Sequence, residues 1–196
     1  MKNIVFFGDS LTAGHGLPAA DSFPARIQSI IDAAGLSYRA FNYGVSGETS
    51  AGGRQRLPSV LARQAPDIFV LALGANDGLR GIPLAQTTAN LRAILHEVRQ
   101  RFPQATLVLA GLHFPFDLGP LGLAALSHYA QQFNGLFRTL AEAEGVAFIP
   151  HLLAGVLGNP TLNLPDRVHP NAAGQRVLAD NVWAVLAPLL QARQTA

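Results

Sequence analysis

The chain has 196 residues, 49% of them hydrophobic, so it lies within the usual size of one domain and can bury a substantial core. Its 14 basic and 12 acidic residues are scattered and give a formal charge of only +2, so no basic patch indicates a nucleic-acid partner. The absence of cysteine excludes disulfides, thiolate nucleophiles and cysteine-bound zinc or iron–sulfur sites. Any catalysis must therefore use oxygen and imidazole groups.

The first apolar run follows directly after Met1, Lys2 and Asn3. It covers residues 4–7 and is too short for a signal peptide or a membrane span. We therefore expect a soluble protein without stable membrane insertion, cytoplasmic as the chain is written. A periplasmic or secreted location is the alternative if a signal peptide has been removed.

Five short apolar runs, often β-branched, predict buried strands. They cover residues 3–7, 38–43, 67–73, 106–112 and 146–150. Between them lie segments with apolar residues at helical spacing, such as Leu91, Ile94, Leu95 and Val98. Strands that alternate with helices predict a parallel sheet with right-handed crossovers and helices on both faces. The expected fold is an α/β three-layer α/β/α sandwich, with residues 1–196 as a single domain.

Capping residues and glycines mark helix boundaries. Asp21 or Ser22 can cap a helix that Pro24 helps to start and that Gly35 ends. Gly145 follows a later helical stretch at the place where a terminal glycine is expected. These signals agree with the alternation of strands and helices.

Polar, glycine-rich stretches follow the predicted strands, at the edge where open parallel sheets bind ligands. They are residues 8–11 (Gly-Asp-Ser-Leu), 44–48 (Gly-Val-Ser-Gly-Glu), 74–78 (Gly-Ala-Asn-Asp-Gly) and 166–171 (Asp-Arg-Val-His-Pro-Asn). Together they supply a hydroxyl, an imidazole, a carboxylate, an amide side chain and backbone N–H groups. Acyl transfer requires this set of groups.

Ser10 is the candidate nucleophile for such a reaction. A serine hydroxyl is a poor nucleophile until a base takes its proton, and neutral histidine suits that task near pH 7. His169 is the candidate base, and Asp166, three residues earlier, can accept a hydrogen bond from its other ring nitrogen. The predicted catalytic residues are therefore Ser10, Asp166 and His169.

The tetrahedral intermediate also needs hydrogen-bond donors for its oxyanion. We expect three donors: the backbone N–H groups of Ser10 and Gly47 and the side-chain amide of Asn76. Glycine suits position 47 because a residue without Cβ lets the backbone approach a substrate closely. The Gly-x-Ser-x-Gly elbow is absent, since residues 44–48 fail it at the last position, which argues against an α/β-hydrolase proper.

Four blocks resemble the signature blocks of the GDSL or SGNH hydrolase superfamily, in order and spacing from Ser10 through Gly47 and Asn76 to His169. The resemblance covers essentially the whole chain. Three strings are similar to the bacterial branch of multifunctional thioesterases, lysophospholipases and arylesterases: residues 8–14 (GDSLTAG), 46–50 (SGETS) and 74–81 (GANDGLRG).

This resemblance implies a flavodoxin-like sandwich with five parallel strands, no cofactor, and a serine acyl hydrolase that forms an acyl-serine intermediate. It carries roles over to Ser10, Gly47, Asn76, Asp166 and His169. Members of that branch act on acyl-CoA, aryl esters and lysophospholipids and close a mobile loop over the acyl chain, which here would be residues 75–81. Two differences stand out: many relatives begin with an export signal, which this chain lacks, and residues 112–126 do not match well.

Substrate contacts are expected at the strand ends and in residues 112–126, the likeliest long loop. The candidates are Asp9, Ala75, Asp77, Gly78, Leu79, Leu112, His113 and Phe114. Asp77, Leu112 and Phe114 also suit structural roles. No metal site is predicted, because no pair of the other histidines has carboxylate company at a ligand spacing.

Alternatives of other classes stay open. Residues 14–19 satisfy the loose Gly-x-Gly-x-x-Ala pattern of a nucleotide-binding module, but Pro18 falls where the helix should start and no acidic residue follows at about 20 positions near a second strand end. A catalytically inactive carbohydrate-binding relative is disfavoured, because a competent residue occupies every catalytic position. The runner-up substrate class is O-acetylated carbohydrate.

Overall fold

The computed structural model describes residues 1–113 and 124–192. A five-stranded sheet, parallel throughout, lies at its centre with the order β2-β1-β3-β4-β5. The strands are β1 (Lys2–Gly8), β2 (Tyr38–Gly44), β3 (Ile68–Ala72), β4 (Thr106–Ala110) and β5 (Ala147–Ile149). All five predicted strands are confirmed, and the largest shift of an end is that from Leu112 to Ala110.

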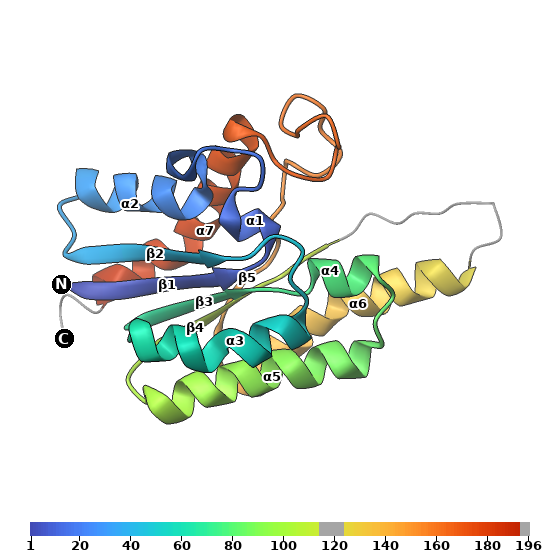
Figure 1. Cartoon of the computed structure of the whole chain (residues 1–196), viewed down its shortest axis with the longest axis horizontal. Coiled ribbons are helices and arrows are strands. Elements are labelled where there is room, and N and C mark those ends of the chain that lie inside the picture. Colours follow the sequence, from blue (N-terminus) through green and yellow to red (C-terminus); the bar gives the residue numbers. More distant parts are fainter. Residues whose placement is uncertain (114–123, 193–196) are drawn as a thin grey trace.

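Helices cover both faces of the sheet (Figure 1). One face carries α2 (Phe23–Ala33) and α7 (Ala172–Ala192), and the other carries α3 (Ser50–Arg63), α5 (Leu84–Arg101) and α6 (Ala124–Glu144). The short elements are α1 (Ser10–Ala13), the 3-10 helix η1 (Ala19–Asp21) and α4 (Ala75–Leu79). The architecture is the expected α/β/α sandwich.

Burial on both faces explains why the apolar runs form strands. Residues 4–7 of β1 are 0% exposed, and all five residues of β3 are buried. Each large side chain of this kind contributes about 1.5–3 kcal/mol by leaving water. The helical spacing is also confirmed: Leu95 of α5 and Phe133 of α6 lie in the core.

The helix ends agree with the predicted signals except at one cap. Gly35 and Gly145 follow α2 and α6 with φ angles of +63° and +60°. Ser22 is the N-cap residue of α2, but its hydroxyl donates to the Ala19 carbonyl at 2.8 Å and does not cap the helix. The first N–H of α2 donates to Oε1 of Gln175 at 2.7 Å instead. A contact with α7 therefore replaces the predicted local cap.

The long loop predicted at residues 112–126 ends earlier than expected. Helix α6 begins at Ala124, so the last residues of the predicted loop are helical. Residues 114–123, including Phe114, lie outside the described residues.

The order of the strands reverses between β1 and β3, because the chain passes from β1 to β2 on one side and returns to β3 on the other. In sheets of this type a ligand crevice forms beyond the carboxyl ends at the reversal. Helix α1 follows β1 and α4 follows β3, and both lie at this end of the sheet (Figure 1). The fold thus places Ser10 and Asn76 at the reversal.

Helix α1 packs directly on the end of β2. A Cβ at Gly44 would lie 2.2 Å from the Ala13 nitrogen and 2.7 Å from the Thr12 carbonyl carbon. Both are backbone atoms, which cannot move aside as a flexible side chain can. The position of α1 therefore depends on glycine at residue 44.

We expect Gly44→Ala to lower the free energy of unfolding by about 1–3 kcal/mol, because the added methyl group overlaps the backbone of α1. Gly135→Ala is the matched control: a Cβ there has no atom within 4 Å, and the position lies inside α6. The control should raise the free energy of unfolding by about 0.5–1 kcal/mol. Urea denaturation of both variants measures the two effects, and an unchanged stability of Gly44→Ala would show that α1 tolerates displacement.

Candidate active site

Ser10 is the first residue of α1, just beyond β1. The preceding residue, Asp9, is the N-cap of this short helix, and its Oδ1 accepts a hydrogen bond from the backbone N–H of Leu11 at 3.0 Å. Ser10 is 7% exposed and lines a small cavity. The cap therefore fixes the backbone that carries the hydroxyl.

His169 and Asp166 lie in the turn before α7. Oδ2 of Asp166 is 2.8 Å from Nδ1 of His169. Its Oδ1 accepts the backbone N–H groups of His169 and Val168 at 3.0 and 2.9 Å. The backbone N–H of His169, then its ring and the N–H of Val168, lower the pKa of Asp166 to about 2. The ionised acceptor favours the imidazole tautomer with its proton on Nδ1 and a lone pair on Nε2.

The structure brings this turn to Ser10 across 159 residues of sequence. Nε2 of His169 lies 3.0 Å from Oγ of Ser10. This separation is within the range of about 2.6–3.2 Å that a base and its nucleophile need. Ser10, His169 and Asp166 form a continuous chain of hydrogen bonds.

The predicted oxyanion donors lie in the loops after β1, β2 and β3. Within the described residues, the backbone N–H groups of Ser10 and Gly47 have no hydrogen-bond acceptor. Nδ2 of Asn76 donates to the Glu48 carbonyl at 3.0 Å, which leaves its second N–H available. Asn76 and Ser10 line the same cavity.

Gly47 adopts a left-handed backbone conformation with a φ angle of +79°, which by itself favours glycine. An ideal Cβ at this position would have no protein atom within 4 Å. Its carbonyl accepts a hydrogen bond from Nη2 of Arg80 at 3.0 Å. The side chain of Arg80 thereby connects this glycine to the segment just after α4.

Asp77 anchors α4 and was a candidate substrate contact. It is 0% exposed, and its carboxylate accepts the backbone N–H of Ser50 at 2.8 Å and the hydroxyls of Ser50 and Thr87 at 2.5 and 3.2 Å. These bonds tie α4 to the starts of α3 and α5. The structure therefore gives Asp77 a structural role, and the loop expected at 75–81 begins as a short, anchored helix.

A partly buried ion pair that sequence reasoning missed lies beside the loop that contains Gly47. The guanidinium of Arg56 binds the carboxylate of Glu48, with Nε 2.6 Å from Oε1 and Nη2 2.5 Å from Oε2. It also packs 4.0 Å over the ring of Phe7 and donates to the carbonyls of Gly8 and Tyr43 at 3.2 and 2.7 Å. Arg56 thus joins α3 to the ends of β1 and β2. Arginine and glutamate eight residues apart give no sequence signal for such a pair.

A cavity of about 90 Å³ adjoins Ser10 and His169. Its lining residues are Ser10, Leu11, Ala75, Asn76, Leu79, Leu153, Leu157, Val168 and His169. Ala75 and Leu79 were predicted, and Leu79 is 56% exposed at the rim. Leu153, Leu157 and Val168 were not predicted, because they lie in the irregular connection after β5, where no periodicity marks them.

Other predicted substrate contacts lie elsewhere. Leu112 is 2% exposed and packs in the hydrophobic core, so the structure gives it a packing role. Gly78 belongs to α4 but does not line the cavity. The exposed His113 has its ring centre 5.3 Å from that of His151. Phe114 falls outside the described residues.

Asp9 is also corrected as a substrate contact, because it is 0% exposed. Burial raises its pKa to about 7, and the nearby charges of Glu48 and Asp77 act in the same direction. Among the described residues its Oδ2 has no hydrogen-bond partner. Asp9 therefore supports α1 from beneath.

His15 is a further residue that sequence reasoning did not assign to the site. The centre of its ring lies 4.4 Å from that of His169. It belongs to residues 14–19, which match the loose nucleotide-binding pattern, and it is one of the histidines for which no metal site was predicted. No spacing in the sequence marks its contact with His169, because the two histidines are far apart along the chain.

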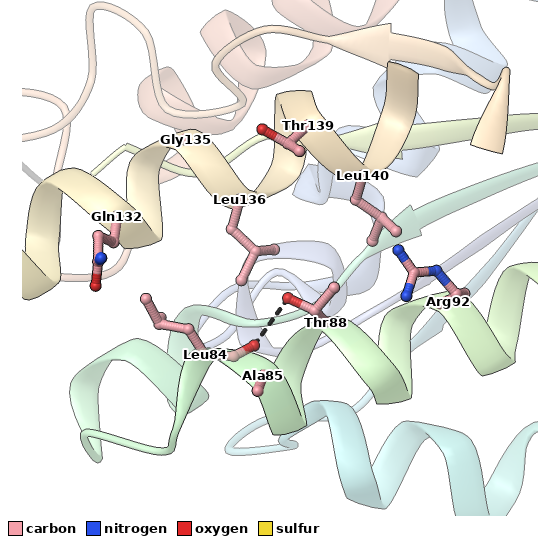
Figure 2. Close-up of a pocket in the computed structure, with 9 residues that line it drawn as sticks. All are labelled: Leu84, Ala85, Thr88, Arg92, Gln132, Gly135, Leu136, Thr139 and Leu140. Atoms are coloured by element: carbon pink, nitrogen blue, oxygen red, sulfur yellow. Dashed lines mark hydrogen bonds between the residues drawn. The ribbon is translucent and has the colours of Figure 1, made fainter. Parts of the chain in front are cut away.

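A larger groove of about 430 Å³ lies between α5 and α6 (Figure 2). Leu84, Leu136 and Leu140 point into it, and among the described residues that line it the one ionisable side chain, Arg92, is paired with Glu144. These described residues include no nucleophile beside a base and none of the predicted site residues. Among the described residues, no group of three or more histidine, aspartate or glutamate side chains could hold a metal ion. The chemistry is therefore concentrated at the strand ends.

The model of the GDSL-like Lipase/Acylhydrolase family matches residues 6–177, from β1 into α7. The chain belongs to this family. It is 36% identical over 189 residues to Esterase TesA of Pseudomonas aeruginosa, over 96% of this chain and 90% of the relative. It is 31% identical over 187 residues to Thioesterase 1/protease 1/lysophospholipase L1 of Escherichia coli, over 95% of this chain and 84% of the relative.

A crystal structure of TesA has a TM-score of 0.87 to this structure, at 36% identity, and the match covers 96% of this chain and 99% of that one. The fold is that of SGNH-hydrolase esterases, and the protein is a GDSL-type esterase. None of the described helices combines the length and apolar character that a membrane span requires.

We expect Asp9→Asn to change how stability depends on pH. The unfolded chain releases the Asp9 proton near its ordinary pKa of 3.8, whereas the folded protein keeps it up to about pH 7. The protonated carboxyl therefore contributes stability that is complete below the unfolded pKa and is lost as the pH rises through 7. Relative to wild type, the variant should gain free energy of unfolding between about pH 5 and about pH 8.

Urea denaturation at the two pH values measures this gain. Asp32→Asn is the control: it removes an exposed carboxylate on α2, which accepts a hydrogen bond from Nε2 of Gln28 at 2.7 Å, and so tests the loss of a carboxylate without burial. Its difference from wild type should stay constant over the same interval. A pH-independent difference for Asp9→Asn would contradict the raised pKa.

Proposed function

We propose that this esterase cleaves carboxylic esters through an acyl-Ser10 intermediate, with His169 as the base and Asp166 as the acid that orients it. The observation that carries the proposal is the 3.0 Å separation between Oγ of Ser10 and Nε2 of His169. The hydrogen bond of 2.8 Å that Nδ1–H of His169 donates to Oδ2 of Asp166 supports the same assignment. The distance and the expected tautomer of His169 both favour transfer of the proton from Oγ of Ser10 to Nε2 of His169.

In the first half of the reaction, Oγ of Ser10 attacks the acyl carbon while its proton passes to Nε2 of His169. The imidazolium is stabilised by the ionised carboxylate of Asp166 and returns the proton to the leaving alcohol or thiol when the tetrahedral intermediate collapses. In the second half, water gives a proton to His169 and attacks the acyl-serine. Collapse of the second intermediate releases the acid and restores the Ser10 hydroxyl.

The oxyanion of each intermediate would be bound by the N–H groups of Ser10, Gly47 and Asn76. The bond from Asn76 to the Glu48 carbonyl supports this role, because it orients the amide before substrate arrives. The ion pair of Glu48 with Arg56 stabilises the loop that contains this carbonyl. The donors therefore need little reorganisation during the reaction.

Short acyl groups fit the site best. The cavity beside Ser10 has a volume of about 90 Å³, which is small beside the roughly 300–1,000 Å³ of typical ligand pockets. Leu11, Leu153 and Leu157 give it an apolar lining that suits an alkyl chain. We propose aryl and alkyl esters with short acyl groups as substrates, with acyl-CoA thioesters and lysophospholipids as further classes.

O-acetylated carbohydrate is the second candidate substrate, because an acetyl group also fits this cavity. The cavity accounts for the acyl part and leaves the alcohol part open to solvent-exposed residues such as Val168, which is 46% exposed.

A cytoplasmic location of the protein, or an exported one after removal of a signal peptide, stays a prediction.

Ser10→Ala should abolish hydrolysis of p-nitrophenyl esters without unfolding the protein, because it removes the nucleophile and leaves the backbone of α1 unchanged. Rates for p-nitrophenyl and CoA esters from acetyl to palmitoyl should peak at short chains. Ser29→Ala, which removes an exposed hydroxyl on α2, is the matched control and should retain full activity. Activity retained by Ser10→Ala would refute the assignment, whereas activity confined to acetylated sugars would favour the second substrate class.

Asn76→Ala should lower kcat by about 10²–10³-fold with little change in KM, because the lost donor binds the oxyanion rather than the ground state. Asn76→Asp should be at least as impaired, since a carboxylate repels the oxyanion. Steady-state kinetics on one p-nitrophenyl ester measures both variants. An unchanged kcat in Asn76→Ala would remove this residue from the oxyanion hole.

A further inference from the structure

We propose that His15 is a positioning residue for His169: its ring packs against the imidazole and holds it in line with the Ser10 hydroxyl. This inference rests on the proposed roles of Ser10 and His169. It assigns a function to a side chain that makes no contact with the reacting bond. Three observations carry it.

The first observation is the contact between the two rings. Their centres are 4.4 Å apart and their planes are inclined at 41°. At this separation each ring limits the rotation of the other. His169 therefore has a ring neighbour in addition to its two hydrogen-bond partners.

The second observation is that the exposed His15 ring has a hydrogen-bond partner of its own. Its Nδ1 lies 3.2 Å from Oγ of Ser46, the residue before Gly47. The ring thus spans two parts of the site, the turn that carries His169 and the loop that carries Gly47. A displacement of either part would disturb this contact.

The third observation is the backbone that presents His15. Gly14 and Gly16 have φ angles of +74° and +75°, so the chain turns sharply on both sides of the histidine. The N–H of His15 donates to the Ser10 carbonyl at 3.1 Å, which returns the chain to the nucleophile. The two glycines that match the nucleotide-binding pattern thus serve this turn.

The surroundings of His169 explain why such support is useful. The side chain of Asp166 is 42% exposed and that of His169 is 22% exposed, so their hydrogen bond competes with water. The turn that carries them belongs to no helix or strand. A misplacement of about 1 Å in a catalytic group can cost about 10²-fold in rate.

The experiment compares His15→Ala, which removes the ring, with His15→Phe, which keeps a ring but no hydrogen bond. We expect His15→Ala to lower kcat about tenfold with KM within about twofold of wild type. His15→Phe should recover most of that loss. His96→Ala, which removes an exposed histidine on α5, is the control and should have wild-type kcat.

Ser46→Ala tests the anchor of the ring. It should lower kcat less than His15→Ala does, and it should cause no further loss when His15 is already alanine, because the two residues then act through one contact. The proton NMR signal of the Nδ1–H between His169 and Asp166 gives an independent readout. It should be sharp in wild type and His15→Phe and broadened in His15→Ala.

The proposal is overturned if kcat of His15→Ala equals that of wild type, or if His15→Phe is as impaired as His15→Ala. If His15→Ala does not fold, Ser46→Ala and His15→Phe still decide it through kcat and the NMR signal. Failure of the proposed function has a different signature: Ser10→Ala would then retain activity, whatever the His15 variants do.

Discussion

Parallel strands in register end at one level, and the whole site depends on this constraint. Gly8 of β1 pairs with Gly44 of β2 on one side and with Ala72 of β3 on the other. The chain therefore leaves three neighbouring strands along a single line, and the loops that follow carry Ser10, Gly47 and Asn76. Each loop needs only a few residues to reach the site. The strand reversal between β1 and β3 provides the space in which the side chains meet.

Buried and partly buried carboxyl groups hold these loops. They differ in how many hydrogen-bond donors and positive charges surround them. The charges of Glu48 and Asp77 lie close enough to Asp9 to raise the pKa of its carboxyl group, in addition to the larger effect of burial. Glu48 has the guanidinium of Arg56, and Asp77 has one N–H and two hydroxyl donors. Asp9 has the single N–H of Leu11, so burial dominates and its pKa rises. Asp9, which is next to Ser10, is thus the carboxyl group with the fewest donors and positive charges around it.

Asp166 shows the opposite balance at the surface of the site. Its pKa falls because three donors point at its two oxygens, and exposure to water imposes little penalty on the charge. Asp166, beside the proposed base His169, therefore stays ionised at neutral pH, whereas Asp9, next to the proposed nucleophile Ser10, has a pKa of about 7. The same type of side chain serves as a charged partner in one place and as a helix cap in the other.

The sequence by itself determined the strands, the order of helices and the four polar blocks, because apolar periodicity and residue type at strand ends are local signals. It also placed Ser10, His169 and Asp166 as candidates, since their chemistry is recognisable from residue type and spacing. The cap of α2 was predicted wrongly because Gln175, from the far end of the chain, takes the place of Ser22. Asp9 and Leu112 were given substrate contacts because the sequence carries no measure of how deeply a residue lies.

Only the tertiary structure decided which residues meet across long separations. His15 lies against His169, Arg56 joins the ends of β1 and β2, and Leu153 and Leu157 line the cavity beside Ser10. None of these contacts has a periodicity or a fixed spacing, because each depends on how two loops or elements pack in space. Sequence reveals chemistry that is local to a strand end, whereas the support around that chemistry comes from packing between distant segments.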